Sequence, residues 1–240
     1  MLNNYLLSFK NRTNSPDIVM LYRLKWAQIE GVITTKALKI LDFGSGFGTT
    51  ANYFAKDNAV TAIEPNASMV EAREQDNDYR QIVGNYLDLK GLESESFDLI
   101  ICHNVLEFAA ERADIVKEFS RLLKVGGVLS VVKNNQEGRI LSRAVLGDLD
   151  SALDLIGGGH IENTFGVVSI YAPEKLALWG EGLTIEKTLA LQTFYGLQGN
   201  HELKTTTDWH DQMFELEMKV ADHVPYKLIS LFNHIVLRKS

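Results

Sequence analysis

The chain has 240 residues, 45% of them apolar, and its 24 Lys and Arg against 31 Asp and Glu give a formal charge of −7. This length and apolar content exclude intrinsic disorder and fit one α/β domain, and a single cysteine excludes an internal disulfide. The acidic balance argues against a protein held to nucleic acid by bulk charge alone, although it leaves room for a local basic patch.

The amino-terminal residues lack the charged start and unbroken apolar stretch of a secretory signal. The strongly apolar stretches, such as Val128–Val132, have the length of strands and are too short for a membrane span. We therefore expect a cytoplasmic protein with no membrane partner. Cys102 lies in an apolar run, which predicts a buried side chain rather than a reactive thiol.

Apolar periodicity predicts strands that alternate with helices after a helical lead-in at 18–29. The predicted strands are 38–43, 59–63, 81–84, 97–102 and 128–133, and the predicted helices are 49–56, 67–74 and 112–123. Such alternation indicates a mostly parallel sheet with both faces covered.

The regular alternation stops after Lys133. The remaining chain carries a helical patch at 139–155, a helix at 173–182, a strand-like stretch at 183–195, a helix at 208–220 and an apolar strand at 232–238. We find no internal repeat, so we expect one domain over residues 1–240. Its predicted parts are a helical segment at 18–37, a ligand-binding core at 38–133, a lid at 134–170 and closing helices and strands at 171–240.

A predicted buried strand runs directly into a glycine-rich turn at Asp42–Gly48. Glycines there allow positive φ angles and let a ligand approach the backbone, although a tight turn without a ligand would use them too. The spacing is Gly-x-Gly-x-Gly, which is neither the dinucleotide fingerprint nor a phosphate-binding loop. Glu64 ends the next strand, 22 residues after Asp42, where a carboxylate can accept hydrogen bonds from both hydroxyls of a ribose.

Four segments in order, Leu41–Gly48, Glu64, Ser96–Ile100 and Arg121–Leu129, resemble the class I S-adenosylmethionine-dependent methyltransferases. The resemblance spans about residues 38–133. It implies a Rossmann-like seven-stranded, mostly parallel sheet with an antiparallel last strand and a helical lid insertion. It also implies S-adenosyl-L-methionine as the cofactor, S-adenosyl-L-homocysteine as the product, and no metal.

The same resemblance implies cofactor contacts at the carboxyl ends of the strands. They are Arg23, Asp42, Gly44, Ser45, Gly46, Gly48, Glu64, Pro65, Met69, Asn85, Tyr86 and His103. Among them, Glu64 would hold the ribose diol, and Arg23 is an approximate counterpart of an arginine that contacts the cofactor. We interpret His103 as a cofactor or substrate contact rather than a general base, and we assign no catalytic residue.

The residues after the fourth strand suggest the kind of methyl acceptor. His103–Leu106 lacks the Asn/Asp-Pro-Pro-aromatic motif of many methyltransferases that act on exocyclic amines, and the single cysteine precedes the turn that faces the substrate. A carboxylate acceptor is already an anion and needs no base, so catalysis reduces to placing its oxygen in a dry pocket. An oxygen acceptor, a carboxylate, therefore fits best.

Distal segments resemble the bacterial methyltransferases of 5-carboxymethoxyuridine in tRNA. They are 134–138, 145–150, 214–217, 225–226 and 234–239, while the basic run of those enzymes is replaced here by Gly157–His160. Arg139 and Arg143 lie four residues apart and could grip a phosphate or a substrate carboxylate, or form a solvated helix face. A tRNA substrate, a small metabolite and a non-catalytic cofactor-binding role stay open, as do a monomer and a homodimer.

Overall fold

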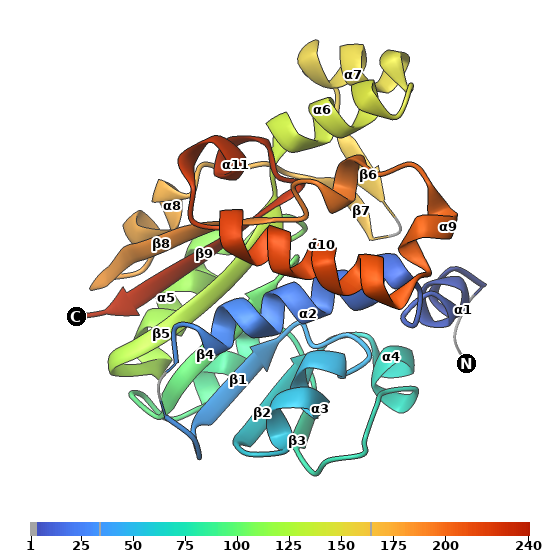
Figure 1. Cartoon of the computed structure of the whole chain (residues 1–240). Helices are drawn as coiled ribbons and strands as arrows, with labels where there is room; N and C mark the ends of the chain where they lie inside the picture. Colours follow the sequence, from blue (N-terminus) through green and yellow to red (C-terminus); the bar gives the residue numbers. More distant parts are fainter. Residues whose placement is uncertain (1–3, 34, 164) are drawn as a thin grey trace.

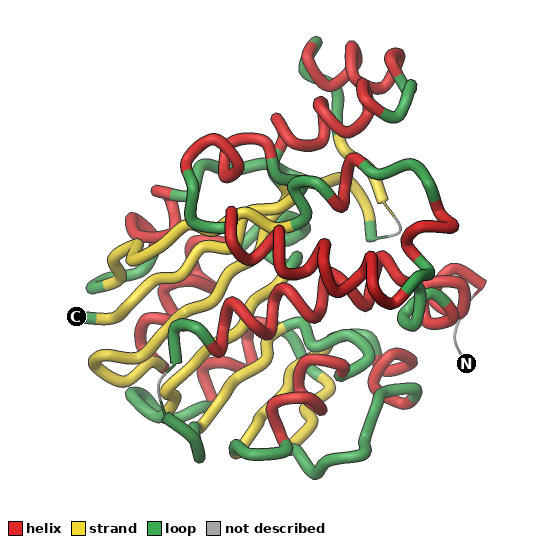
Figure 2. Tube along the Cα trace, viewed as in Figure 1, coloured by secondary structure: helices red, strands yellow, loops and turns green. Residues whose placement is uncertain are grey.

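The computed structural model describes residues 4–33, 35–163 and 165–240. Its centre is a seven-stranded sheet in the spatial order β3-β2-β1-β4-β5-β9-β8, with helices on both faces (Figures 1 and 2). The strands are β1 (Lys39–Phe43), β2 (Ala59–Glu64), β3 (Arg80–Val83), β4 (Phe97–His103), β5 (Leu123–Asn134), β8 (Leu183–Leu191) and β9 (Phe232–Lys239).

Two groups of helices cover the sheet. The helices before β5 are α1 (Asn4–Asn11), α2 (Pro16–Glu30), α3 (Thr49–Ala55), α4 (Ala67–Glu71), the 3-10 helix η1 (Tyr86–Gly91) and α5 (Arg112–Leu122). Those after β5 are α6 (Gln136–Val145), α7 (Leu149–Ile156), α8 (Glu174–Trp179), η2 (Tyr195–Leu197), α9 (His201–Lys204), α10 (Thr207–Val220) and α11 (Val224–Ile229). Helices α2 and α10 pack side by side over one face, and α5 and α8 pack together on the other (Figure 1).

The direction of the strands confirms the expected sheet. Strands β3, β2, β1, β4 and β5 are parallel to one another, whereas β9 is antiparallel to both β5 and β8. The last strand is thus the antiparallel one, as the sequence predicts. Because the carboxyl ends of the five parallel strands share one edge, that edge is where a ligand is expected.

Two predicted boundaries before residue 134 shift by three residues or more in the structure. The helix predicted at 67–74 ends at Glu71, and the strand predicted at 128–133 begins already at Leu123. The pair Gly126-Gly127 therefore lies inside β5 instead of before it. Gly126 has a φ of +79°, and the pairing register shifts between Phe97 and Leu99, so the glycines accommodate an irregularity in the strand.

The predicted helical patch at 139–155 is two helices, α6 and α7. Gly147 separates them with a φ of +89°, and the side chain of Asp148 accepts a hydrogen bond from the amide of Ser151 to cap α7. The short hairpin β6 (Ile161–Asn163) and β7 (Gly166–Val168) comes next. These elements form one insertion between β5 and α8, and α6 and α7 project from the body of the molecule (Figure 1).

The strand-like stretch predicted at 183–195 stops at Leu191 because a buried carboxylate turns the chain. Glu217 on α10 accepts hydrogen bonds from the amides of Thr193, Phe194 and Tyr195, at 2.8–2.9 Å. These amides therefore bond to a side chain instead of continuing the sheet.

Close packing attaches the insertion to the body at Gly138. A Cβ atom on this residue would lie 1.9 Å from the backbone oxygen of Ser230, which belongs to the turn before β9. We expect Gly138→Ala to lower the free energy of unfolding by about 1–3 kcal/mol, since backbone must move to admit the methyl group. Denaturant unfolding measures the change. Gly91→Ala is the matched control, because a Cβ atom there meets nothing within 4 Å; equal losses in both variants would contradict the packing argument.

Candidate functional site

The glycine-rich loop joins β1 to α3 at the carboxyl edge of the sheet. Gly44, Gly46 and Gly48 have φ angles of +77°, +58° and +75°, a region that side chains other than glycine rarely adopt. A Cβ atom on Gly44 would lie 2.3 Å from a methyl carbon of Val105. The loop thus requires glycine both for its backbone angles and for its close contact with the turn after β4.

Glu64 ends β2 directly beside this loop and is only 7% exposed. Its Oε2 accepts a hydrogen bond from the amide of Gly46 and its Oε1 from the amide of Asn66, each at 2.9 Å. Each carboxylate oxygen can accept more than one hydrogen bond. The two amides therefore hold the carboxylate in a fixed orientation and leave it capacity to accept bonds from a ligand.

Asp42 on β1 and Lys25 on α2 are both buried, at 4% and 5% exposure, and each acts electrostatically on the other. Burial raises the pKa of Asp42 to about 7, against the opposing effect of Lys25, and burial lowers the pKa of Lys25 to about 8. The Lys25 ammonium donates to Oδ1 of Asn104, at 3.1 Å, in the turn after β4. Lys25 is a residue of this edge that the sequence reasoning missed.

The raised pKa of Asp42 predicts a pH-dependent stability. Its ordinary value is 3.8, so between about pH 4 and 7 the folded protein keeps a proton that the unfolded chain releases, and stability falls as the pH rises. We expect a fall of about 2 kcal/mol, half of what the full shift corresponds to, since relaxation weakens buried electrostatics. Urea unfolding at several pH values should show this slope in the wild type and a flatter profile in Asp42→Asn. Parallel profiles would assign the slope to other groups.

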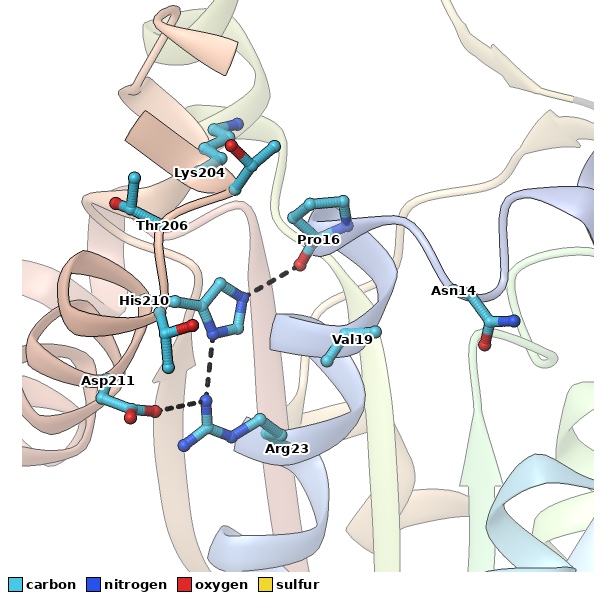
Figure 3. A pocket seen from close by; sticks show the side chains of 10 residues that line it. Asn14, Pro16, Val19, Arg23, Lys204, Thr206, His210 and Asp211 are labelled. Atoms are coloured by element: carbon cyan, nitrogen blue, oxygen red, sulfur yellow. Dashed lines mark hydrogen bonds and ion pairs between the residues drawn. The ribbon is translucent and has the colours of Figure 1, made fainter. Parts of the chain in front are cut away.

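Arg23 points to helix α10 (Figure 3). Its guanidinium pairs with Asp211 at 2.9 Å, contacts Nδ1 of His210 at 3.0 Å, and lies over the ring of Phe214. Arg23, His210 and Asp211 line a pocket between α2 and α10. The structure thus places the expected arginine contact in a different environment, and Lys25, two residues later, is the cation whose charge acts on Asp42.

The residues expected near an adenine lie around the end of β2 and the start of η1. Met69 is buried, and its methyl carbon would lie 3.3 Å from a Cβ atom on Gly46, whereas Pro65 is exposed. Asn85 is exposed and caps η1 by accepting from the amide of Leu87, and Tyr86 is half-buried. The structure therefore brings Met69 to the loop and gives the Asn85 side chain a local capping partner.

Among the polar side-chain atoms that are shielded from solvent and have no hydrogen-bond partner in the described residues, three lie at the ends of β1 and β4 and in the loop after β1. They are Oδ2 of Asp42, Oγ of Ser45 and Nδ1 of His103. Burying such atoms without partners costs free energy, so their clustering indicates a place where a ligand supplies the missing bonds. Ser45 and His103 were both expected here from the sequence.

Arg139 and Arg143 lie on α6 and line a cavity of about 250 Å³ between α6, α7 and β6. The Nε atom of Arg139 donates to Oδ1 of Asn134 at 2.8 Å, its plane lies over the ring of Phe232, and burial lowers its pKa to about 10. Arg143 is exposed and pairs with Asp148 at 2.8 Å. The structure therefore distinguishes the two arginines: Arg139 is held by packing, and Arg143 is a surface residue.

Glu107 extends the polar network from the turn after β4 towards Arg139. It is 1% exposed, and its Oε1 accepts hydrogen bonds from the backbone and side-chain amides of Asn134. Asn134 in turn accepts from Arg139. The sequence shows Glu107 only as a charge after a strand, so its burial could not be read from it.

Within residues 4–33, 35–163 and 165–240, no helix is both long and apolar enough to cross a membrane. In the same ranges, no group of three or more His, Cys, Asp or Glu side chains could hold a metal ion. Cys102 is buried, as expected.

Comparison with known families and proteins gives matches in sequence. Residues 41–131 match a family model described as a methyltransferase domain. The chain is 25% identical over 231 residues to the tRNA 5-carboxymethoxyuridine methyltransferase of Escherichia coli, covering 89% of this chain and 86% of that protein. It is 26% identical over 164 residues to the ubiquinone biosynthesis O-methyltransferase of Coxiella burnetii, covering 66% and 67%.

Comparison with solved structures gives matches in fold. A Thermotoga maritima structure, described as an S-adenosylmethionine-dependent methyltransferase and a possible histamine N-methyltransferase, aligns with a TM-score of 0.65. It is 14% identical, with 98% of this chain and 97% of that chain covered. The putative methyltransferase of Haloferax volcanii, solved with its Trm112 activator, aligns with a TM-score of 0.63 at 14% identity, covering 98% and 94%. At such identities these structures establish the shared fold.

Proposed function

We propose that this S-adenosylmethionine-dependent methyltransferase holds its cofactor over the loop Gly44–Gly48 and methylates a carboxylate oxygen of a modified wobble uridine in tRNA. The proposal combines the polar groups around the loop, the half-buried Arg139, and the similarity of 89% of the chain to a tRNA 5-carboxymethoxyuridine methyltransferase. The observation that carries the substrate assignment is the extent of that last similarity.

The residues at the carboxyl edge fit the adenosine part of the cofactor. Glu64 would hold the two ribose hydroxyls, since its carboxylate is oriented by the amides of Gly46 and Asn66 and keeps free acceptor capacity. Gly46 and Gly48 shape the backbone of the loop, and Met69 would contact the adenine beside Pro65. Asn85 and Tyr86 would border the same ring from the start of η1.

The atoms without partners fit the amino-acid part of the cofactor, which carries both an ammonium and a carboxylate. The two acceptors, Oδ2 of Asp42 and Nδ1 of His103, suit the ammonium, and the hydroxyl of Ser45 can donate or accept. We assign to Lys25 the carboxylate contact that Arg23 was expected to make, because Lys25 is buried beside Asp42 whereas Arg23 pairs with α10.

The cofactor supplies a methyl group that a nucleophile can attack directly. The chain's own contribution is then positioning and exclusion of water, because a carboxylate nucleophile needs no base to remove a proton. This agrees with the protonation state of His103. Burial lowers the pKa of His103 well below its ordinary value, so the ring is neutral near pH 7.

Arg139 is the residue we propose to hold the acceptor. Its Nε atom is fixed by Asn134 and its plane by the ring of Phe232, so the guanidinium is ordered before any ligand binds. The described contacts give no partner to its two terminal nitrogen groups. A planar fork of this kind suits a carboxylate, because it donates two parallel hydrogen bonds.

The share of the chain that is similar to a tRNA methyltransferase favours tRNA as the methyl acceptor. The matched methyltransferase domain ends at residue 131, before the insertion that carries Arg139, whereas the similarity to the Escherichia coli tRNA 5-carboxymethoxyuridine methyltransferase covers 89% of the chain. The similarity to the ubiquinone biosynthesis O-methyltransferase of Coxiella burnetii covers 66% of the chain.

Nucleoside mass spectrometry tests the proposal. We expect tRNA from a strain lacking this chain to lose one methyl ester and accumulate the corresponding free carboxylate, and the purified protein to restore the ester in the presence of S-adenosylmethionine. An unchanged set of tRNA nucleosides would reject the tRNA substrate. The net charge of −7 does not favour bulk attraction to tRNA, so a small metabolite is the second candidate, and methyl transfer to a metabolite extract, with none to tRNA, would favour it.

A further inference from the structure

Four polar side chains form a continuous hydrogen-bonded series under helix α2. Oε1 of Gln28 on α2 lies 2.9 Å from Nδ1 of His234 on β9, and Nε2 of His234 lies 2.8 Å from Oγ of Ser130 on β5. The same oxygen lies 2.8 Å from Nε2 of His103, at the end of β4. His234 and Ser130 are fully buried and Gln28 is 3% exposed, so water does not compete for these bonds.

The amide of Gln28 fixes the direction of the first bond. Its Nε2 donates to the backbone oxygen of Ala190 at 2.9 Å, and a carbonyl oxygen can only accept. The other amide atom, facing His234, is therefore the oxygen. Because this oxygen is also only an acceptor, Nδ1 of His234 must carry a hydrogen.

The donor and acceptor in each of the remaining hydrogen bonds follow in turn, up to His103. Burial lowers the pKa of His234 to about 3, so the ring is neutral near pH 7 and its Nε2 is an acceptor. Ser130 must donate its one hydrogen to that nitrogen, which leaves its oxygen to accept from His103. His103 therefore carries its hydrogen on Nε2.

The other ring nitrogen of His103, Nδ1, then carries a lone pair and no hydrogen. Burial, with added repulsion from Lys25 and His234, holds the pKa of His103 well below its ordinary value, so Nδ1 is not protonated near pH 7. This atom is shielded from solvent and has no partner among the described residues. In the sheet register Asp42 is opposite Ile101, two residues before His103, so the side chains of Asp42 and His103 lie on the same face of adjacent strands.

We propose that Gln28, His234 and Ser130 are positioning residues that fix His103 as its Nε2–H tautomer, so that Nδ1 accepts a hydrogen bond from the ammonium group of the cofactor's methionine part. The inference rests on the proposed cofactor site. An imidazole lone pair and the Oδ2 atom of Asp42 together form an acceptor pair for a group with several N–H donors. The tautomer, by contrast, is a property of this chain alone.

Nitrogen NMR of the protein labelled with ¹⁵N-histidine tests the tautomer without any cofactor. We expect His103 to show a hydrogen on Nε2 and His234 to show one on Nδ1, both neutral at pH 7. Ser130→Ala should abolish the preference at His103, whereas Ser120→Ala should leave it intact, because Ser120 is a buried serine of α5 that bonds to the backbone oxygen of Glu181. A hydrogen on Nδ1 of wild-type His103 would overturn the proposal.

Calorimetry tests the ligand. We expect His103→Ala to weaken the binding of S-adenosylhomocysteine about tenfold, the value of one hydrogen bond to a charged group, and Ser130→Ala to weaken it less. Both variants should bind the desamino analogue, in which hydrogen replaces the ammonium group, as tightly as the wild type does. Equal losses for the two ligands would overturn the ammonium contact. A wild type that binds neither ligand would overturn the proposed cofactor site, while the NMR result would still decide the tautomer.

Discussion

Glu64→Ala is expected to weaken the binding of S-adenosylhomocysteine by about 3 kcal/mol, which is more than 100-fold in Kd. The substitution removes a carboxylate that is fixed by two backbone amides and that we propose holds both ribose hydroxyls. It also leaves the amides of Gly46 and Asn66 without their acceptor, so the loop loses its orientation along with the ligand contact. Isothermal titration calorimetry measures the affinity.

Two further variants distinguish the ligand contact from the loop. Glu64→Gln keeps a side-chain oxygen for one amide and lacks the charge, so we expect its loss to lie between those of the wild type and alanine. Glu93→Ala, an exposed acidic residue before β4, is the control and should bind normally. If Glu64→Ala bound the ligand with unchanged affinity while remaining folded, the ribose assignment would be wrong.

The parallel half of the sheet was predictable because local signals mark it completely. Strands β1, β2 and β4 are short, mostly apolar runs, and the loop after β1 carries glycines at positions where the structure has positive φ angles. The order of these elements then determines a parallel sheet, since alternating strands and helices leave few other arrangements. The position of Glu64 at the edge of the sheet was predictable for the same reason, because it ends such a strand.

Lys25 shows what such signals cannot provide. In the sequence it is a lysine on a helix that also carries Arg23, and nothing local distinguishes the two. The structure buries Lys25 because α2 packs over the sheet edge at Asp42 and Asn104, and it directs Arg23 towards Asp211 on α10. These contacts join segments far apart in the chain, so only the packed fold decides which cation lies at the site.

The break between α6 and α7 was predictable in part. The sequence pair Gly147-Asp148 is a helix end followed by a capping residue, and it could have been recognised as the boundary. The apolar pattern on both sides continues at helical spacing, which is why the sequence predicts one helical patch over 139–155 without a break. The series Gln28–His234–Ser130–His103, by comparison, depends on the register of β4, β5 and β9, and no sequence pattern contains that register.

Arg139→Ala is expected to lower kcat/KM for methylation of tRNA by about 100-fold or more, because it removes a preoriented charged fork from an anionic acceptor. The affinity for S-adenosylhomocysteine should not change, since Arg139 bonds to Asn134 and lies over Phe232 on the insertion side. Steady-state methyl transfer measures the first quantity and calorimetry the second.

The neighbouring arginine provides the matched control. Arg143 lies on the same helix and lines the same cavity, but it is exposed and paired with Asp148, so Arg143→Ala should change kcat/KM by less than about threefold. Arg139→Lys separates charge from shape: a lysine keeps the positive charge and loses the planar fork, and we expect it to recover only part of the activity. Since Arg139 also contributes packing, melting temperatures of all three variants must be compared with that of the wild type. Equal losses of activity in Arg139→Ala and Arg143→Ala would point to a general electrostatic attraction of the substrate instead of a specific grip on its carboxylate.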